Sequence, residues 1–207
     1  MWLSSEDNAV TGLKRINIRM LNNINIDLFQ WINAAAGKNP SLDYIAIFFA
    51  ESGPYIVMAL FIFLWFLSNE RRKNTLLLAT EASALGLLFN LAITLIYFHP
   101  RPFMTGIGTT ILSHAPETSF PSDHATLLFS ASLYLLLFSR WVSAGVAMIF
   151  VAVLTSWGRV YCGIHFPFDM AGSLFFSILS CIMIYKSRSL LEYINRWIIS
   201  IYKKLTA

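Results

Sequence analysis

Residue types that bind and transfer phosphate gather in three short segments of the chain. The segments are His99-Pro100-Arg101-Pro102-Phe103, Phe120-Pro121-Ser122-Asp123-His124, and Gly158-Arg159 followed by His165 and Asp169. Arginine carries a permanent planar cation that matches phosphate oxygens. Histidine is suited to nucleophilic attack and to proton transfer near neutral pH. Together these residue types predict a phosphoryl-transfer site that needs no metal ion and depends on positioning and charge stabilisation.

His165 and Asp169 have the spacing of an oriented nucleophile. The two residues are four apart, so in a helix they would lie one turn apart on one face. A carboxylate there can hold one imidazole N–H and leave the other nitrogen free to attack. Asp169 also interrupts an apolar stretch, where an ionisable residue suggests a function. His124 is then the predicted general acid that protonates the leaving oxygen.

Two of the segments resemble the starts of helices. Pro121 precedes Ser122 and Asp123, either of which can cap a helix, and Pro167 suits the first turn of another helix. A helix N-terminus presents unpaired N–H groups and the positive end of a dipole, and both favour an anion. The sequence therefore predicts two anion-binding helix ends at the same site.

Arg101 and Arg159 are the predicted phosphate ligands of this site. Both adjoin apolar stretches, where an unpaired cation is costly. The head group of a bulk lipid would satisfy either arginine taken alone. Their grouping with two histidines and two helix starts favours a specific phosphate site.

The composition shows what kind of protein must position these residues. Of the 207 residues, 57% are hydrophobic and only 13% are charged. A soluble domain carries about 25% charged residues, so a soluble enzyme, a disordered chain and a secreted disulfide scaffold are excluded. The net charge of +4 comes without a basic stripe interleaved with aromatic residues, which argues against nucleic-acid binding. Cys162 and Cys181 lack metal-ligand spacing and fit a membrane core.

The apolar stretches predict an all-α integral membrane protein with a bundle of five transmembrane helices. The predicted spans are residues 42–67, 75–98, 125–138, 141–157 and 168–185. Residues 24–36 are too short and too polar to span, and we interpret them as an interfacial or re-entrant half-helix. The chain is thereby divided into an N-terminal segment (1–41), a transmembrane domain (42–188) and a C-terminal amphipathic cytoplasmic helix (189–207).

Basic residues predict the orientation of the bundle. They follow spans one, three and five, as Arg71, Arg72, Lys73, Arg140, Lys186, Arg188, Arg196, Lys203 and Lys204. Such residues mark the cytoplasmic side. The loops 99–124 and 158–167 then meet on the outer face, toward the periplasm or cell exterior. The side of the N-terminus stays open, because Lys14, Arg15 and Arg19 conflict with the same parity.

The three segments also resemble the motifs of the type-2 phosphatidic acid phosphatase superfamily of membrane lipid phosphatases. The superfamily motifs are Lys-x6-Arg-Pro, Pro-Ser-x-His and Ser-Arg-x5-His-x3-Asp. They correspond here to Thr94-x6-Arg101-Pro102, Pro121-Ser122-Asp123-His124 and Gly158-Arg159-x5-His165-x3-Asp169. Order and spacing match over roughly residues 43–186. The amino-acid sequence around the second and third motifs resembles that of the bacterial undecaprenyl-diphosphatase group linked to bacitracin resistance.

The resemblance implies an activity and a set of roles. The implied reaction is hydrolysis of undecaprenyl diphosphate to undecaprenyl phosphate on the outer face of the bacterial inner membrane, which recycles the carrier lipid for cell-wall synthesis. His165 would be the nucleophile that forms a phospho-enzyme, Asp169 its partner and His124 the leaving-group acid. The implied phosphate-binding residues are Arg101, Ser122, Arg159 and the backbone near Asp123. No cofactor and no metal ion are implied.

Two positions depart from the family pattern. Thr94 stands where the family has lysine, and we expect it to lie two turns down the second span, too deep to replace that charge. His99 is a candidate to compensate at low pH. Gly158 stands where the family has serine, and a backbone N–H is expected to substitute for the lost hydroxyl. These changes bear on substrate preference more than on reaction class.

Several alternatives stay open at this level. The same chemistry could act on phosphatidylglycerophosphate or phosphatidic acid, or pass the phosphoryl group to lipid A. A lipid transporter or flippase is the alternative from another class, but five spans without repeat symmetry argue against it. His114 and Glu117 are expected to be solvated loop residues, with contact to the diphosphate as the alternative. The expected partners are a polyprenyl diphosphate substrate and membrane lipids.

Overall fold

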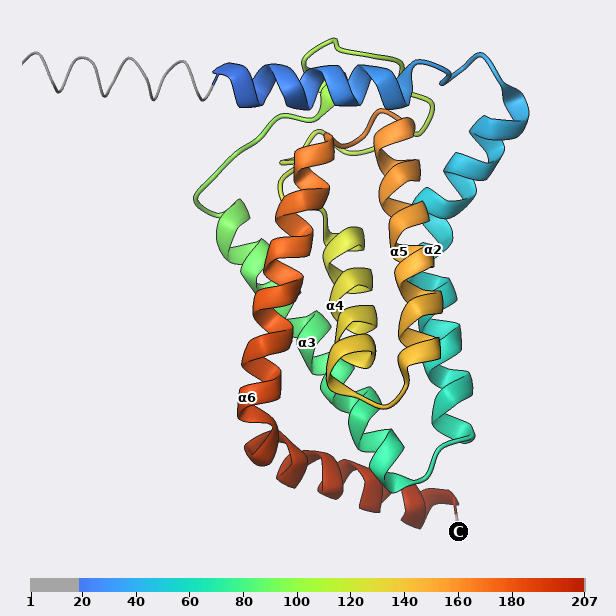
Figure 1. Cartoon of the computed structure of the whole chain (residues 1–207), viewed down its shortest axis with the longest axis vertical. Coiled ribbons are helices and arrows are strands. Elements are labelled where there is room, and N and C mark those ends of the chain that lie inside the picture. Colours follow the sequence, from blue (N-terminus) through green and yellow to red (C-terminus); the bar gives the residue numbers. More distant parts are fainter. Residues whose placement is uncertain (1–18, 207) are drawn as a thin grey trace, which may run out of the picture.

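Five helices run side by side through the protein in a computed structural model that describes residues 19–206 (Figure 1). They are α2 (Pro40–Phe66), α3 (Glu70–Thr94), α4 (Asp123–Phe138), α5 (Val142–Tyr161) and α6 (Pro167–Thr206). A short 3₁₀ helix, η1 (Pro102–Met104), lies in the α3–α4 connection. Residues 19–33 are also helical. The prediction of an all-helical membrane bundle is confirmed.

Four of the five helices are long and apolar enough to cross a bilayer, namely α2, α3, α5 and α6. The fifth, α4, has only 16 residues and lies at the centre, packed against α3, α5 and α6. Large apolar side chains face outward from the surrounding helices, among them Tyr55, Phe63, Leu88, Phe150 and Phe175. Such a surface is unstable in water and is solvated by lipid tails. The bundle is therefore built around α4 and faces the membrane on its flanks.

Hydroxyl side chains fasten α4 to α6. Ser177 donates to the backbone oxygen of Thr126 at 3.1 Å, and Ser173 donates to the backbone oxygen of Ser122 at 3.0 Å. Small polar residues allow helices to approach closely inside a membrane, and their hydrogen bonds add to the packing. These contacts hold the N-terminal ends of α4 and α6 in register, one turn from Asp169.

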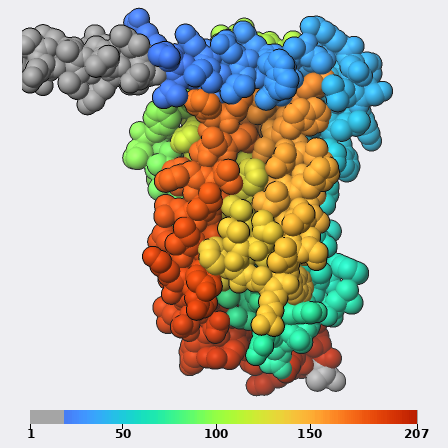
Figure 2. Space-filling model, viewed as in Figure 1, coloured from blue at the N-terminus to red at the C-terminus, as the bar shows by residue number. Residues whose placement is uncertain are grey.

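The helix of residues 19–33 lies across the end of the bundle, where Figures 1 and 2 show it covering the ends of α5 and α6. The Asn33 side chain donates to the backbone oxygens of Tyr161 and Thr109, both at 2.7 Å. The Asn25 side chain accepts from the backbone N–H of Phe168 at 2.9 Å. Of the two alternatives for this segment, the crossing arrangement fits an interfacial helix. Lys14 and Arg15 lie outside the described residues, whereas Arg19 lies in this helix.

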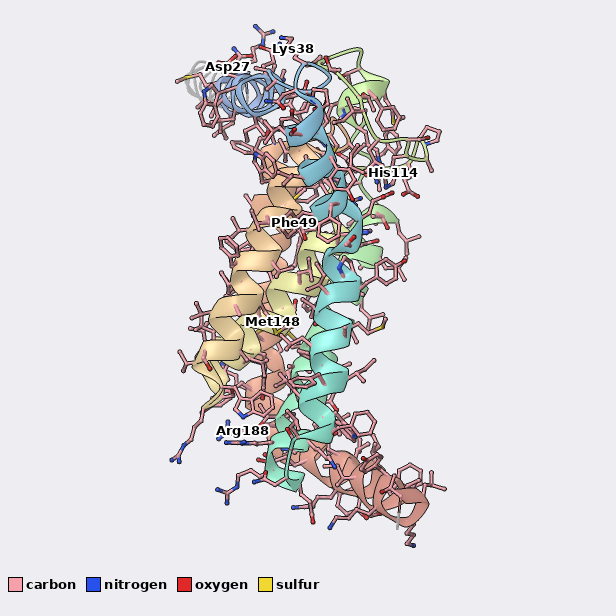
Figure 3. The ribbon with its side chains drawn as sticks, turned by 90° about the vertical axis from the view of Figure 1, so that its right-hand side faces the viewer. Asp27, Lys38, Phe49, His114, Met148 and Arg188 are labelled. Carbon is pink, nitrogen blue, oxygen red and sulfur yellow. The ribbon has the colours of Figure 1, made fainter. Side chains whose placement is uncertain are left out.

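The basic residues of the predicted cytoplasmic side lie at the opposite end of the bundle. Figure 3 labels Arg188 there, far from His114 in the α3–α4 connection. The helix that we expected as a separate C-terminal element continues α6 without a break, and Figure 1 shows it turning across the bundle end. Lys203 pairs there with Glu70 at the start of α3. The Lys73 ammonium lies 4.2 Å from the centre of the Tyr202 ring.

Two predicted helix boundaries are wrong, and both affect the site. The second span was expected to reach Phe98, but α3 ends at Thr94. The chain beyond it turns at Leu95 and Ile96 and leaves the helix, and the His99 N–H donates to the Thr118 hydroxyl at 3.0 Å instead of to a helical oxygen. The fourth span was expected to end at Trp157, but α5 continues to Tyr161. Arg159 is therefore held by a helix rather than by a loop.

Candidate active site

The imidazole of His165 lies between two guanidinium groups. Arg101 Nη1 donates to His165 Nε2 at 3.0 Å, and Arg159 Nη2 approaches the same nitrogen at 3.3 Å. Arginine has donors only, so Nε2 must be the unprotonated acceptor. The lone pair of His165 therefore points to the place where an anion would meet both arginines.

Asp169 sets the tautomer of His165 from the other side of the ring. His165 Nδ1 lies 3.2 Å from Asp169 Oδ2, and the same oxygen accepts the backbone N–H of Phe166 at 2.8 Å. Asp169 is fully buried in the first turn of α6. We predicted this contact from a helical 165–169 segment, but α6 begins only at Pro167. The pair forms because the Phe166 N–H folds the chain back onto the carboxylate.

His165 is neutral near pH 7. Burial is the main cause that lowers the pKa of His165 to about 3; the contact with Asp169 acts in the opposite direction, and the charges of Arg159 and Arg101 act in the same direction as burial. A histidine with so low a pKa does not need to lose a proton before it attacks. An unprotonated nitrogen of His165 therefore faces the two arginines at physiological pH.

The terminal Nη atoms of the two arginines donate hydrogen bonds to backbone oxygens. Arg101 Nη1 also donates to the oxygen of Ile164 at 2.9 Å, and Arg159 Nη1 donates to the oxygen of Ala50 at 3.1 Å. Among residues 19–206, the buried Nε atoms of both arginines and the Ser122 hydroxyl have no hydrogen-bond partner. Buried donors without partners are costly, and phosphate oxygens would satisfy them.

A cavity of about 390 Å³ brings most of the predicted site residues together. Its walls include Arg101, Asp123, His124, Arg159 and His165. Asp169 lies behind His165, outside this wall, as an orienting carboxylate requires. His124, in the first turn of α4, also lines the cavity. The arrangement provides one candidate nucleophile, one candidate proton donor and two cations around a single anion-sized volume.

Ser122 is placed differently from our expectation. It occupies the N-cap position of α4, but its side chain makes no capping hydrogen bond. Its backbone N–H donates instead to the Ser173 hydroxyl at 2.9 Å. Asp123 lines the cavity, and its Oδ1 accepts from the Asn90 side chain at 2.8 Å. The polar entry to α4 is thus held by neighbouring helices, and Ser122 itself is fully buried and absent from the cavity wall.

The two departures from the family motifs are explained by packing. Thr94 was expected to lie too deep, but it ends α3 and lines the cavity beside Arg101. Gly158 lies within α5, where a Cβ would come within 2.5 Å of the Ala46 oxygen in α2. Its N–H belongs to the helix, so it does not replace a side-chain hydroxyl. The absence of a side chain at Gly158 lets α5 approach α2, and this brings Arg159 to Ala50.

The expectation that His114 and Glu117 are solvated holds for Glu117, which is exposed, and is wrong for His114, which is half-buried. Both line the cavity, and His114 Nε2 lies 3.3 Å from Arg159 Nη2. Burial, followed by the charge of Arg101, lowers the pKa of His114. The fold of residues 105–118 places both side chains at the cavity. In the sequence, the one indication of this was that His114 and Glu117 lie between two of the motifs. His99, by contrast, is absent from the cavity wall and faces Asp169 instead.

We expect Glu117 to compete with phosphate for Arg101. Its carboxylate lies 3.3 Å from Arg101 Nη2 and is 61% exposed. We expect Glu117→Gln to tighten binding of inorganic phosphate by about two- to fivefold, because an exposed ion pair contributes up to about 1 kcal/mol. Isothermal titration calorimetry measures this difference. Glu192→Gln, at the opposite end of the bundle, is the matched control and should leave the affinity unchanged; unchanged affinity in Glu117→Gln would contradict the competition.

Among the described residues, no group of three histidine, cysteine, aspartate or glutamate side chains could hold a metal ion. The charge of a bound phosphate would be balanced by Arg101 and Arg159 instead.

Comparisons with known proteins agree with this geometry. The family model of the PAP2 superfamily matches residues 75–192, which include all three motif segments. The chain is 35% identical to YbjG of Escherichia coli (strain K12) over 163 residues, which are 79% of this chain and 82% of YbjG. It is 30% identical to the undecaprenyl-diphosphatase BcrC of Bacillus subtilis (strain 168), over 88% of this chain and 93% of BcrC.

A solved structure supports the fold. The crystal structure of Aquifex aeolicus LpxE superimposes with a TM-score of 0.65 at 25% identity. The superposition covers 79% of this chain and 95% of LpxE. The helical arrangement around the cavity is therefore shared with a solved protein.

Proposed function

The chain belongs to the PAP2 superfamily, and on this basis we propose that it hydrolyses undecaprenyl diphosphate to undecaprenyl phosphate and inorganic phosphate. The reaction passes through a phospho-histidine on His165 and regenerates the carrier lipid of cell-wall synthesis. The similar protein BcrC is named an undecaprenyl-diphosphatase, and this name supports the choice of substrate. The observation that carries the proposal is the junction, at His124, of a cationic phosphate cavity and a long apolar groove.

The cavity geometry supports a two-step transfer. In the first step, His165 Nε2 attacks the terminal phosphorus. The N–P bond forms, the bond from phosphorus to the bridging oxygen breaks, and His124 gives its proton to that oxygen. In the second step, His124 takes a proton from water, whose oxygen attacks phosphorus and displaces His165. Arg101 and Arg159 balance the charge on the transferred group in both steps.

The apolar groove gives the lipid tail a place beside the cavity. Its first hollow, of about 450 Å³, shares Thr94, Asp123 and His124 with the cavity. Two more hollows follow along α2 and α3, and each shares wall residues with the hollow before it. The last hollow reaches Trp65 and Phe66. From Pro54 to Phe66 the groove follows α2 for about 18 Å. Because Tyr55 and Met58 on its wall are exposed, the groove opens toward the bilayer.

The orientation belongs to the same proposal. The chain is a multi-pass membrane protein, and the site lies at the end opposite the basic residues at the start of α3 and in the α4–α5 connection. By the positive-inside rule, we place the site on the outer face of a bacterial inner membrane. We also assign residues 42–188 to the phosphatase domain, preceded and followed in the chain by interfacial segments. Residues 1–18 and 207 of these segments lie outside the described part.

The test is phosphate release by the detergent-purified protein with EDTA present. Undecaprenyl diphosphate, phosphatidylglycerophosphate and phosphatidic acid are offered in parallel. We expect the undecaprenyl lipid to be hydrolysed fastest and EDTA to have no effect. Faster hydrolysis of either phospholipid would contradict the substrate and keep the chemistry; loss of activity in EDTA would contradict the chemistry. Binding without hydrolysis would favour a transporter.

A pair of variants tests the groove. Leu77 lines only the last hollow, and Leu77→Trp should reduce hydrolysis of the long-chain diphosphate by about tenfold while sparing farnesyl diphosphate, whose tail is too short to reach it. Leu88→Trp is the matched control, because Leu88 lies on the same helix, α3, and faces outward. Equal effects of Leu77→Trp on both substrates would contradict the tail site.

A further inference from the structure

His99 lies on the far side of Asp169 from His165. His99 Nδ1 is 3.4 Å from Asp169 Oδ1, whereas His165 Nδ1 is 3.2 Å from Asp169 Oδ2. The fully buried carboxylate therefore lies between two imidazoles from distant parts of the chain. Only one of the two, His165, borders the phosphate cavity.

The two carboxylate oxygens of Asp169 differ in their hydrogen bonds. Oδ2 receives His165 and the backbone N–H of Phe166, whereas Oδ1 makes no hydrogen bond within residues 19–206. A buried carboxylate oxygen without a donor is unfavourable. Among the described ionisable side chains, the one within ion-pair distance of this oxygen is His99.

The ring of His99 is fixed by the α3–α4 connection. Nδ1 lies 2.8 Å from the hydroxyl of the fully buried Ser119, and that hydroxyl donates to the Pro100 oxygen at 3.4 Å. In the tautomer that this bond to Pro100 favours, the Ser119 hydroxyl accepts from Nδ1, and Nδ1 carries the hydrogen. The ring edge also packs on Phe166, with 5.6 Å between ring centres. The Nδ1–H is thereby held where both Ser119 and Asp169 can share it.

We propose that His99 is a positioning residue, which holds Asp169 Oδ1 so that Oδ2 stays aligned with His165 Nδ1. This inference rests on the proposed phospho-histidine reaction. When His165 Nε2 bonds to phosphorus, the ring becomes cationic and keeps its Nδ1 proton on Asp169. A carboxylate that is held at one oxygen cannot rotate away from that proton, so the charge is stabilised without reorganisation.

A matched pair of variants tests the role. In His99→Asn the amide N–H₂ can take the place of Nδ1–H, whereas His99→Leu has no donor. Supporting groups of this kind are worth about 10–100-fold when removed. We expect kcat for undecaprenyl diphosphate to fall about 10–100-fold in His99→Leu and less than about threefold in His99→Asn, with KM changed less than about twofold in both. Melting temperatures, measured in parallel, report whether each variant is folded.

A spectroscopic measurement separates this inference from the proposed function. The Nδ1 proton of His165 is followed by NMR in protein labelled with ¹⁵N-histidine, for wild type and both variants. We expect its signal to be kept in His99→Asn and to shift or broaden in His99→Leu, whatever substrate the enzyme prefers. An inactive wild type would overturn the proposed function alone. An unchanged His165 signal in His99→Leu, or equal loss of kcat in both variants, would overturn the role of His99.

Discussion

His165→Asn is expected to lower release of phosphate from undecaprenyl diphosphate by at least about 10⁴-fold. Removal of a catalytic nucleophile has effects of this size in other enzymes that form covalent intermediates. Asparagine is the informative replacement, because its amide N–H₂ can occupy the position of Nδ1–H and still donate to Asp169. The variant therefore keeps the contact at Asp169 Oδ2 and loses the nitrogen that faces Arg101 and Arg159.

Two measurements make this result specific. After brief exposure to lipid labelled with ³²P at the terminal phosphorus, wild type should carry acid-labile label and His165→Asn should carry none. The melting temperature in detergent should change little, which excludes unfolding as the cause. Residual turnover above about one per cent of wild type would mean that water attacks phosphorus directly, and the phospho-histidine would have to be abandoned.

The second large effect is expected at His124, and it should depend on the leaving group. General acid catalysis contributes about 10²–10⁴-fold. We expect His124→Gln to lose activity in this range on phosphatidic acid, whose leaving alcohol needs a proton. The loss should be less than about tenfold on an aryl phosphate, whose leaving group departs as a stable anion. Steady-state kcat/KM for both substrates measures the difference.

His114→Gln is the matched control for this experiment. His114 lines the same cavity and contacts Arg159, but we assign it no proton transfer. Its replacement should affect both substrates alike, through phosphate binding. A loss in His124→Gln that is equal for both leaving groups would show that His124 also acts through binding or packing, and the assignment of the acid would be wrong.

The fold class and the chemistry were accessible from the sequence for physical reasons. A chain with 57% hydrophobic and 13% charged residues cannot bury its apolar surface in water, so the helical membrane bundle follows from composition. Arg101, His124, Arg159, His165 and Asp169 were found because a buried polar group in an apolar chain is costly and calls for a function. These signals are local in the sequence, so they can be recognised without knowledge of any tertiary contact.

Helix ends were less accessible, because distant contacts decide them. Residues 95–98 are apolar enough to extend the second span, but the chain leaves the helix after Thr94, and the His99 N–H donates to the Thr118 hydroxyl at 3.0 Å. Thr94 moves from the expected depth to the cavity wall as a result. At Gly158 the close approach to α2 lets α5 continue and carry Arg159 into the site.

The sequence by itself determined that this chain spans a membrane and carries the groups for phosphoryl transfer, since composition and spacing along one chain suffice for both. Only the tertiary structure decided which further residues join that site. His99 meets Asp169, and His114 meets Arg159, across 70 and 45 positions of the chain. No local pattern records such pairs, because the folding of the α3–α4 connection over the helix ends creates them.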